Sequence, residues 1–295
     1  PVILINTRRL TGIQVINDAK QVICLPGATL DKLEKELTPF NREPHSVIGS
    51  SCIGASVLGG VCNNSGGALV RRGPAYTELA LYARVNESGQ LELVNHLGVN
   101  LGSTPEEILS NLESQQYQLN DIQHDSNCCA SDQHYAHDVT QVDENTPARF
   151  NADPSRLFEA SGSAGKVCVF AVRLDTFEKI PSQVFYVGTH TQEHLTAIRR
   201  FLLKDLPRLP IAGEYIHRVA YDIGAEYGKD TFMFIEKFGT ARVPAAFAMK
   251  DKVDGYLDKI GMKGLSDKAL QLLTKFLPSH LPKRMNEFRD LYEHH

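Results

Sequence analysis

Residues 49–67 read GSSCIGASVLGGVCNNSGG, with six glycines in nineteen positions. Small or apolar residues fill most of the gaps, a pattern typical of neither an amphipathic helix nor an alternating strand. Glycine permits positive φ and lets another group approach the main chain closely. With serines among the glycines, backbone N–H groups and hydroxyls can converge on one anion such as a pyrophosphate. A tightly packed turn is the alternative, but the density of small residues favours a ligand-binding cradle.

A second glycine motif follows at residues 161–170, SGSAGKVCVF, where Gly162 and Gly165 come directly before an apolar run that predicts a buried strand. Together the two motifs predict two backbone surfaces that hold one extended ligand. The chain has no GxxxxGK[ST] motif, so a P-loop is not indicated. No GxGxxG follows a strand either, so a Rossmann dinucleotide site is not indicated.

The remaining pattern mixes short strands with amphipathic helices and predicts an α+β fold. The stretch 115–157 is polar and aperiodic, and a domain boundary is expected near Thr176. Beyond that boundary the order strand, helix, strand predicts a small α+β domain. Expected strands are 2–5, 21–25, 77–85, 90–98, 166–174, 184–190 and 231–239, and expected helices are 28–40, 104–112, 192–203 and 217–228.

Composition bounds the class of protein. The 295 residues are 42% hydrophobic and 22% charged, which predicts a globular chain of about two domains. A net charge of −4 without basic patches between aromatics gives no reason to expect a nucleic-acid partner. No apolar run approaches the roughly 20 residues of a bilayer span. Because the chain opens with a proline in a strand-like run and stops at EHH in a polar helical pattern, we expect a segment of a longer protein.

Several other groups could carry chemistry, and each has a plainer interpretation. The six cysteines form no CxxC pair, so reduced thiols are expected, although the neighbouring Cys128 and Cys129 could be redox-active. Three histidines with nearby aspartates could suit a metal, but a solvated loop is favoured and no metal is expected. They are His124, His134 and His137, with Asp125, Asp132 and Asp138.

His217 and Arg218 could act as an acid/base and a carboxylate clamp, but a polar helix start is at least as good an interpretation. Residues 236–295 hold 11 basic against 8 acidic residues, interspersed with aromatics. Such a segment could dock on anionic lipid, although composition alone favours an exposed helical face. The aromatics are Phe247, Tyr256, Phe276, Phe288 and Tyr292.

Five stretches resemble one family along the whole chain: NREPHSVIGSSCIGASVLGGVCNNSGG, RRGPAYTELALYARVN, VNHLGVNLG, TPARFNADPSRLFEASGSAGK and FLPSHLPKRM. They are similar to the bacterial respiratory, quinone-dependent D-lactate dehydrogenases. These are FAD-containing members of the superfamily whose FAD domain (PCMH/VAO type) resembles that of vanillyl-alcohol oxidase. The loop 115–157 diverges from the family more than its surroundings do.

The resemblance implies three parts. Residues 1–175 would be the later part of the FAD-binding domain, 176–216 the start of an α+β cap domain, and 217–295 a basic membrane-associated segment. It also implies that the first FAD lobe precedes Pro1 and that the rest of the cap and FAD domains follows His295. Positions that match the family's FAD contacts, or lie in the same motifs, are Gly49, Ser56, Gly59, Gly60, Gly66, Gly165 and Val169.

The activity implied is oxidation of D-lactate to pyruvate, with FAD as cofactor and a membrane quinone as electron acceptor. The implied partners include an anionic phospholipid surface, at the cytoplasmic face of the bacterial inner membrane. The catalytic base and carboxylate clamp are expected outside this chain. Two alternatives stay open: a flavoenzyme of another D-2-hydroxy acid, such as D-2-hydroxyglutarate or glycolate, and a non-catalytic, flavin-free segment that only associates with membranes.

Overall fold

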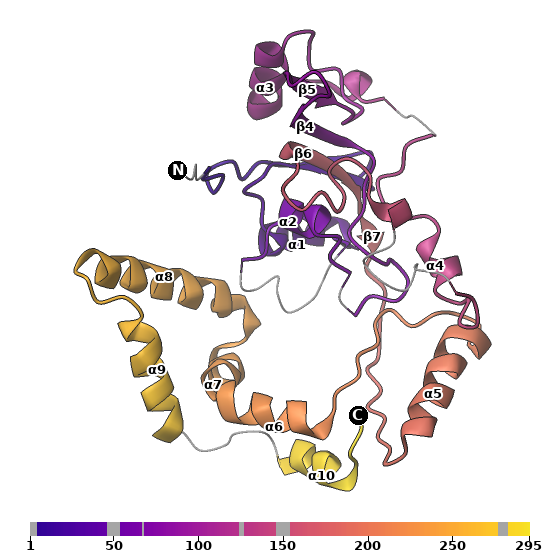
Figure 1. The fold of residues 1–295 in the computed structure, drawn as a ribbon, viewed down its shortest axis with the longest axis vertical. Coiled ribbons are helices and arrows are strands. Elements are labelled where there is room, and N and C mark those ends of the chain that lie inside the picture. The colour runs from indigo at the N-terminus through magenta and orange to yellow at the C-terminus, as the bar shows by residue number, and fades with distance from the viewer. Residues whose placement is uncertain (1–4, 46–53, 67, 124–126, 146–153, 277–282) are drawn as a thin grey trace. The chain divides into compact units, whose positions relative to one another are not determined.

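The computed structural model describes residues 5–45, 54–66, 68–123, 127–145, 154–276 and 283–295. The expected strand at 2–5 lies outside these ranges. The chain divides into two compact units, each traced in Figure 1. Unit 1 comprises residues 1–181 and 203–213, and unit 2 comprises 182–202 and 214–295.

Unit 1 is built on a five-stranded antiparallel sheet in the order β1-β2-β6-β4-β5. The central strand is β6, the apolar run that follows the second glycine motif, and the prediction of a buried strand there is confirmed. A separate two-stranded sheet joins β3 to β7. The strands are β1 (Ile13–Ile16), β2 (Gln21–Cys24), β3 (Arg42–Glu43), β4 (Ala80–Val85), β5 (Leu91–Asn95), β6 (Cys168–Asp175) and β7 (Phe177–Glu178).

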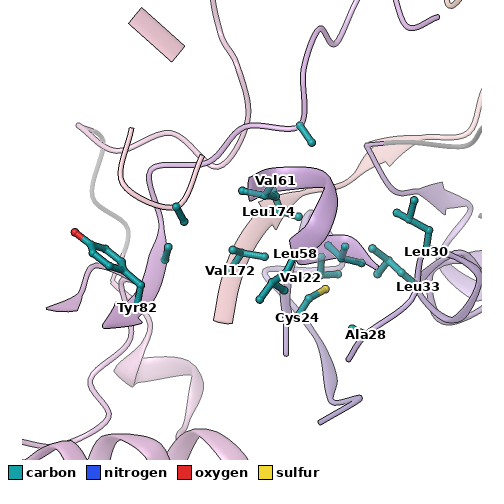
Figure 2. Close-up of a cluster of buried hydrophobic side chains, with 14 of the residues drawn as sticks. Val22, Cys24, Ala28, Leu30, Leu33, Leu58, Val61, Tyr82, Val172 and Leu174 are labelled. Carbon is teal, nitrogen blue, oxygen red and sulfur yellow. The ribbon is translucent and has the colours of Figure 1, made fainter. Parts of the chain in front are cut away.

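Helices pack on both faces of this sheet. Alternate residues of β2 point to opposite faces, so Val22 joins one buried cluster and Ile23 the other. Helices α1 (Leu30–Leu37) and α2 (Val57–Cys62) complete the first cluster, seen in Figure 2. Helix α3 (Pro105–Ser114) completes the second. The antiparallel sheet is therefore the middle layer of three.

Local sequence explains where these helices begin. Thr29 caps α1, accepting a hydrogen bond from the Lys32 amide at 3.2 Å. Thr104 and Glu107 form a capping box at the start of α3, where the Thr104 hydroxyl accepts from the Glu107 amide. The first helix was predicted from the spacing of its leucines and the second from its Thr104 cap, and both are confirmed. The stretch 115–157 holds only short turns of helix in its described part: η3 (Leu119–Asp121), α4 (Tyr135–Asp138) and η5 (Pro154–Arg156).

Unit 2 differs from the predicted strand–helix–strand order. Residues 184–190 form no strand, and Thr189 makes only an isolated bridge with His294. The run 231–239 is helical, because a short apolar run does not separate strand from helix by periodicity. Rings of Phe234 and Phe238, one turn apart, pack at 5.0 Å. The helical predictions at 192–203 and 217–228 are confirmed.

The helices of unit 2 mostly meet their neighbours in sequence. Helix α6 contacts α7, and α8 contacts α9. The polar pattern at the end of the chain suggested a continuing helix. Instead, His294 and His295 form backbone hydrogen bonds with Thr189 and Ile216. No helix in the described part of the chain is long and apolar enough to cross a membrane. The elements are α5 (Gln192–Arg200), η6 (Phe201–Asp205), α6 (Arg218–Tyr227), α7 (Lys229–Phe238), η7 (Thr240–Arg242), α8 (Val243–Lys259), α9 (Leu265–Phe276) and α10 (Lys283–Leu291).

Candidate functional site

Part of the first glycine stretch is helical, contrary to its sequence pattern. Residues Val57–Cys62 form α2, in which Val57, Leu58 and Val61 are buried against the sheet. This packing outweighs the low helix propensity of the adjacent Gly59 and Gly60. The start of α2 is hydrogen-bonded to the residues before α1: the Val57 amide donates to the Ala28 carbonyl at 3.0 Å.

Ser56 caps α2, and its hydroxyl accepts from the Gly59 amide at 3.1 Å. A Cβ on Gly59 would lie 2.6 Å from that hydroxyl, so a larger residue there would require the Ser56 side chain to shift. A Cβ on Gly60 would meet only Ala75, at an ordinary 3.9 Å. Gly66 is buried, and Gly49 lies outside the described residues. The glycines of this stretch therefore have different structural roles.

The second glycine motif lies directly against the end of α2. The Gly162 amide donates to the Val61 carbonyl, and the Ala164 amide donates to the Cys62 carbonyl, both at 3.0 Å. Gly162 and Gly165 have φ of +67° and +88°, which lets the chain turn sharply into β6. The structure thus brings the two motifs together, over about a hundred residues of sequence, into one continuous backbone surface. We call this pair of segments, Ser56–Gly66 and Ala160–Lys166, the glycine junction.

The two turn glycines differ in their surroundings. A Cβ on Gly162 would lie 2.5 Å from the Leu157 Cδ2 and 2.6 Å from the Asn64 Nδ2. A Cβ on Gly165 would meet nothing within 4 Å. Gly162 therefore serves the internal packing of the junction, whereas Gly165 leaves its backbone bare. A bare backbone is what a ligand needs for close approach.

Asn64, which is not among the residues expected from the sequence, is a polar group inside the junction. Its side chain is buried, its φ is +45°, and its Nδ2 donates to the Arg156 carbonyl at 3.1 Å. The Oδ1 atom has no hydrogen-bond partner within the described part of the chain. A buried, unpaired acceptor is costly unless something donates to it, so this oxygen suits an N–H or O–H of a bound ligand. The clue in the sequence was an asparagine, tolerant of positive φ, between glycines.

Val169 lies at an irregular point of the central sheet. It pairs with Tyr82, while the preceding residue of β4, Leu81, pairs with Ala171, so β6 has one extra residue there. Val169 is half-buried against the first cluster, on the face that carries α2. Bulges are common beside functional sites because they redirect a side chain.

Titratable groups near the junction are held neutral or paired. Burial raises the pKa of the Cys62 thiol. Burial, assisted by the Glu159 carboxylate, raises the pKa of Tyr82 to about 12. His96 Nδ1 lies 2.7 Å from Glu159 Oε1. The Arg156 guanidinium pairs with Asp132 at 2.9 Å, so its charge is already compensated. Apart from the exposed Lys166, which belongs to the junction itself, anion binding there would therefore depend mainly on backbone N–H groups.

The other candidate residues have structural partners. Asp132 lies just before α4 and accepts from the amides of His134 and Tyr135. His124 lies outside the described residues, and within the described ranges no three His, Cys, Asp or Glu side chains could hold a metal. His217 is the N-cap of α6 and accepts from the Val219 amide, which confirms the helix-start interpretation. We assign no catalytic residue in this chain.

The cysteines also carry no assigned chemistry. In the described ranges, Cys24, Cys62, Cys129 and Cys168 are free cysteines. The buried Cys24 has its pKa raised to about 12 by desolvation, which keeps the thiol protonated. We expected reduced thiols, and the cysteines in the described part of the chain form no disulfide.

Comparison with known proteins supports the family suggested by the sequence. Residues 184–295 match the family described as "D-lactate dehydrogenase, membrane binding". The whole chain is similar to proteins named quinone-dependent D-lactate dehydrogenase. It is 59% identical to that of Haemophilus influenzae, 55% to that of Escherichia coli and 46% to that of Corynebacterium glutamicum. All of this chain is aligned in each comparison, against 52% of the relative, so the chain spans about half the length of these relatives.

Proposed function

We propose that the protein oxidises D-lactate to pyruvate with FAD as cofactor and passes the electrons to a membrane quinone. The observation that carries the proposal is that the entire chain is 46–59% identical to proteins named quinone-dependent D-lactate dehydrogenase. The glycine junction supports it, because it lies in the segments that match the family's FAD contacts. FAD, when bound, supplies the two-electron acceptor for loss of a hydroxyl proton and a Cα hydride from lactate.

The residues of this chain would bind and orient the cofactor. We propose that the backbone around Gly49, Ser56, Gly59, Gly60, Gly66 and Gly165, together with the Val169 side chain, contacts FAD. The bare backbone at Gly165 and the unpaired Asn64 Oδ1 fit a group that offers both anionic oxygens and N–H or O–H donors. An FAD molecule carries phosphates, ribityl hydroxyls and a flavin N–H.

We further propose that residues 1–175 are part of a PCMH/VAO-type FAD-binding domain, 176–216 begin a cap domain and 217–295 form a membrane-associated segment. The match of residues 184–295 to a membrane-binding family supports peripheral attachment. The site of attachment proposed is an anionic phospholipid surface at the cytoplasmic face of the bacterial inner membrane.

The activity is tested on the protein expressed from its complete reading frame. Flavin absorbance should be present and should bleach anaerobically with D-lactate but not with L-lactate, and added quinone should restore it. Bleaching by D-2-hydroxyglutarate or glycolate in place of D-lactate would support the related flavoenzyme instead. A purified protein without flavin absorbance would support the non-catalytic alternative.

The position of the cofactor is tested with a matched pair of variants. Gly165 and Gly89 both have positive φ and open space where a Cβ would be added, but Gly89 lies in the β4–β5 turn. The strain of a leucine at the two positions should therefore be similar. Gly165→Leu should release flavin on gel filtration, whereas Gly89→Leu should retain it. Equal retention by both variants would remove Gly165 from the cofactor site.

A further inference from the structure

One face of α8 is an exposed apolar ridge. Met249, Val253 and Tyr256 of α8, with Ile260, the C-cap residue directly after it, have relative exposures of 67%, 48%, 67% and 50%. Their spacings of four, three and four residues place them within an arc of about 60° on a helix of 3.6 residues per turn. Such a continuous apolar stripe normally faces a core or a partner. We call these four residues the α8 ridge.

Charges on α8 are sorted around this ridge. Lys252 and Lys259 lie on one flank of the ridge, about 60–90° from it by helical periodicity. Asp251 and Asp258 lie on the opposite side of the helix, about 180° away. All four charged residues are exposed. An apolar stripe with lysines on its flank and acids behind it is the arrangement of a helix that lies in a negatively charged membrane interface.

The neighbouring helix α9 is fixed to α8 by a polar contact away from the ridge. Lys250 Nζ lies 2.8 Å from Asp254 Oδ2 and 2.8 Å from Asp267 Oδ1, which links the two helices. Helix α9 has only twelve residues and leaves Leu272 and Phe276 59% and 80% exposed. The contact with α8 therefore leaves these apolar side chains of α9 uncovered.

We infer that the α8 ridge inserts into the headgroup–acyl boundary of an anionic phospholipid bilayer, with Lys252 and Lys259 held at the headgroups. The inference rests on the proposed membrane attachment and specifies which residues enter the lipid. A protein partner would not require the separation of lysines from acids around the ridge. Lipid does, because cations are attracted to anionic headgroups while acids are repelled. Residues 184–295, which contain α8, match a membrane-binding family.

Insertion is tested directly with a fluorescent probe. The sequence has no tryptophan, so Tyr256→Trp places one on the ridge, and Asp258→Trp places one on the opposite side as the matched control. In the protein from its complete reading frame, the parent spectrum is subtracted. With vesicles of phosphatidylcholine and phosphatidylglycerol that carry acyl-chain bromine, the added emission of Tyr256→Trp should fall and that of Asp258→Trp should not. Equal quenching in both variants, or none in Tyr256→Trp while the protein sediments with the vesicles, would overturn the inference.

A second measurement separates the apolar and charged contributions. Val253→Gln/Tyr256→Gln should weaken sedimentation with these vesicles about tenfold, a loss expected from removing two inserted apolar side chains. Lys252→Gln should weaken it about fivefold, and only when phosphatidylglycerol is present. Asp258→Gln should not weaken it. Unchanged binding by the ridge variant would overturn the inference alone. A parent protein that failed to bind vesicles with or without phosphatidylglycerol would overturn the membrane attachment as well, whereas the lactate reaction is judged separately by flavin bleaching.

Discussion

Replacing Gly162 by alanine should destabilise the glycine junction far more than the same change at Gly165. Both positions have positive φ, where an L-residue costs about 1 kcal/mol. At Gly165 that is the whole cost, because a Cβ meets nothing within 4 Å. At Gly162 the Cβ would lie 2.6 Å from Asn64 Nδ2. Asn64 is 2% exposed, so its side chain is enclosed by the protein.

The difference between the two variants can be estimated from these contacts. Overpacking at Gly162 costs about 1–3 kcal/mol. Displacing Asn64 from the Arg156 carbonyl loses a hydrogen bond of about 1 kcal/mol. Gly162→Ala should therefore lower the free energy of unfolding by about 3–5 kcal/mol, against about 1 kcal/mol for Gly165→Ala.

Urea unfolding, followed by far-UV circular dichroism with both variants and the parent under one protocol, measures this difference. The strain common to both alanines cancels in the comparison, and only the contact with Asn64 and Leu157 remains. If Gly165→Ala lost as much stability as Gly162→Ala, the packing explanation of Gly162 would be refuted.

Three further predictions concern other parts of unit 1. Thr104→Ala removes the capping box of α3 and should cost about 1 kcal/mol in urea unfolding, with Thr104→Ser close to the parent. Burial, with Arg72 nearby, lowers the pKa of His45 to about 4 from an ordinary 6.5. The free energy of unfolding should therefore be highest above pH 6.5 and should fall by up to about 3 kcal/mol as pH decreases toward 4, because the histidine becomes protonated more easily in the unfolded chain. In urea unfolding measured at several pH values, His45→Gln should make this fall smaller. Iodoacetamide should alkylate the exposed Cys168 in the native protein and spare Cys24 until urea is added, as mass spectrometry of peptides would show; early modification of Cys24 would contradict its burial.

Sequence patterns predicted most of unit 1 because its elements follow from local rules. Leucines at helical spacing located α1, and the Thr104 cap located α3. The β4–β5 hairpin followed from two strand-like runs joined by the turn signal NESG. The apolar run at 231–239 was wrongly predicted as a strand, because neither its length nor its composition distinguishes the two states.

The sequence by itself determined the family resemblance, the α+β class and the two glycine motifs. Only the tertiary structure decided what each glycine does. Contacts across about a hundred residues make Gly162 a packing residue, leave Gly165 bare, and place the unpaired Asn64 oxygen between the two motifs. Spacing along a chain records φ preferences and periodicity, but which atoms surround a backbone depends on segments that meet only after folding.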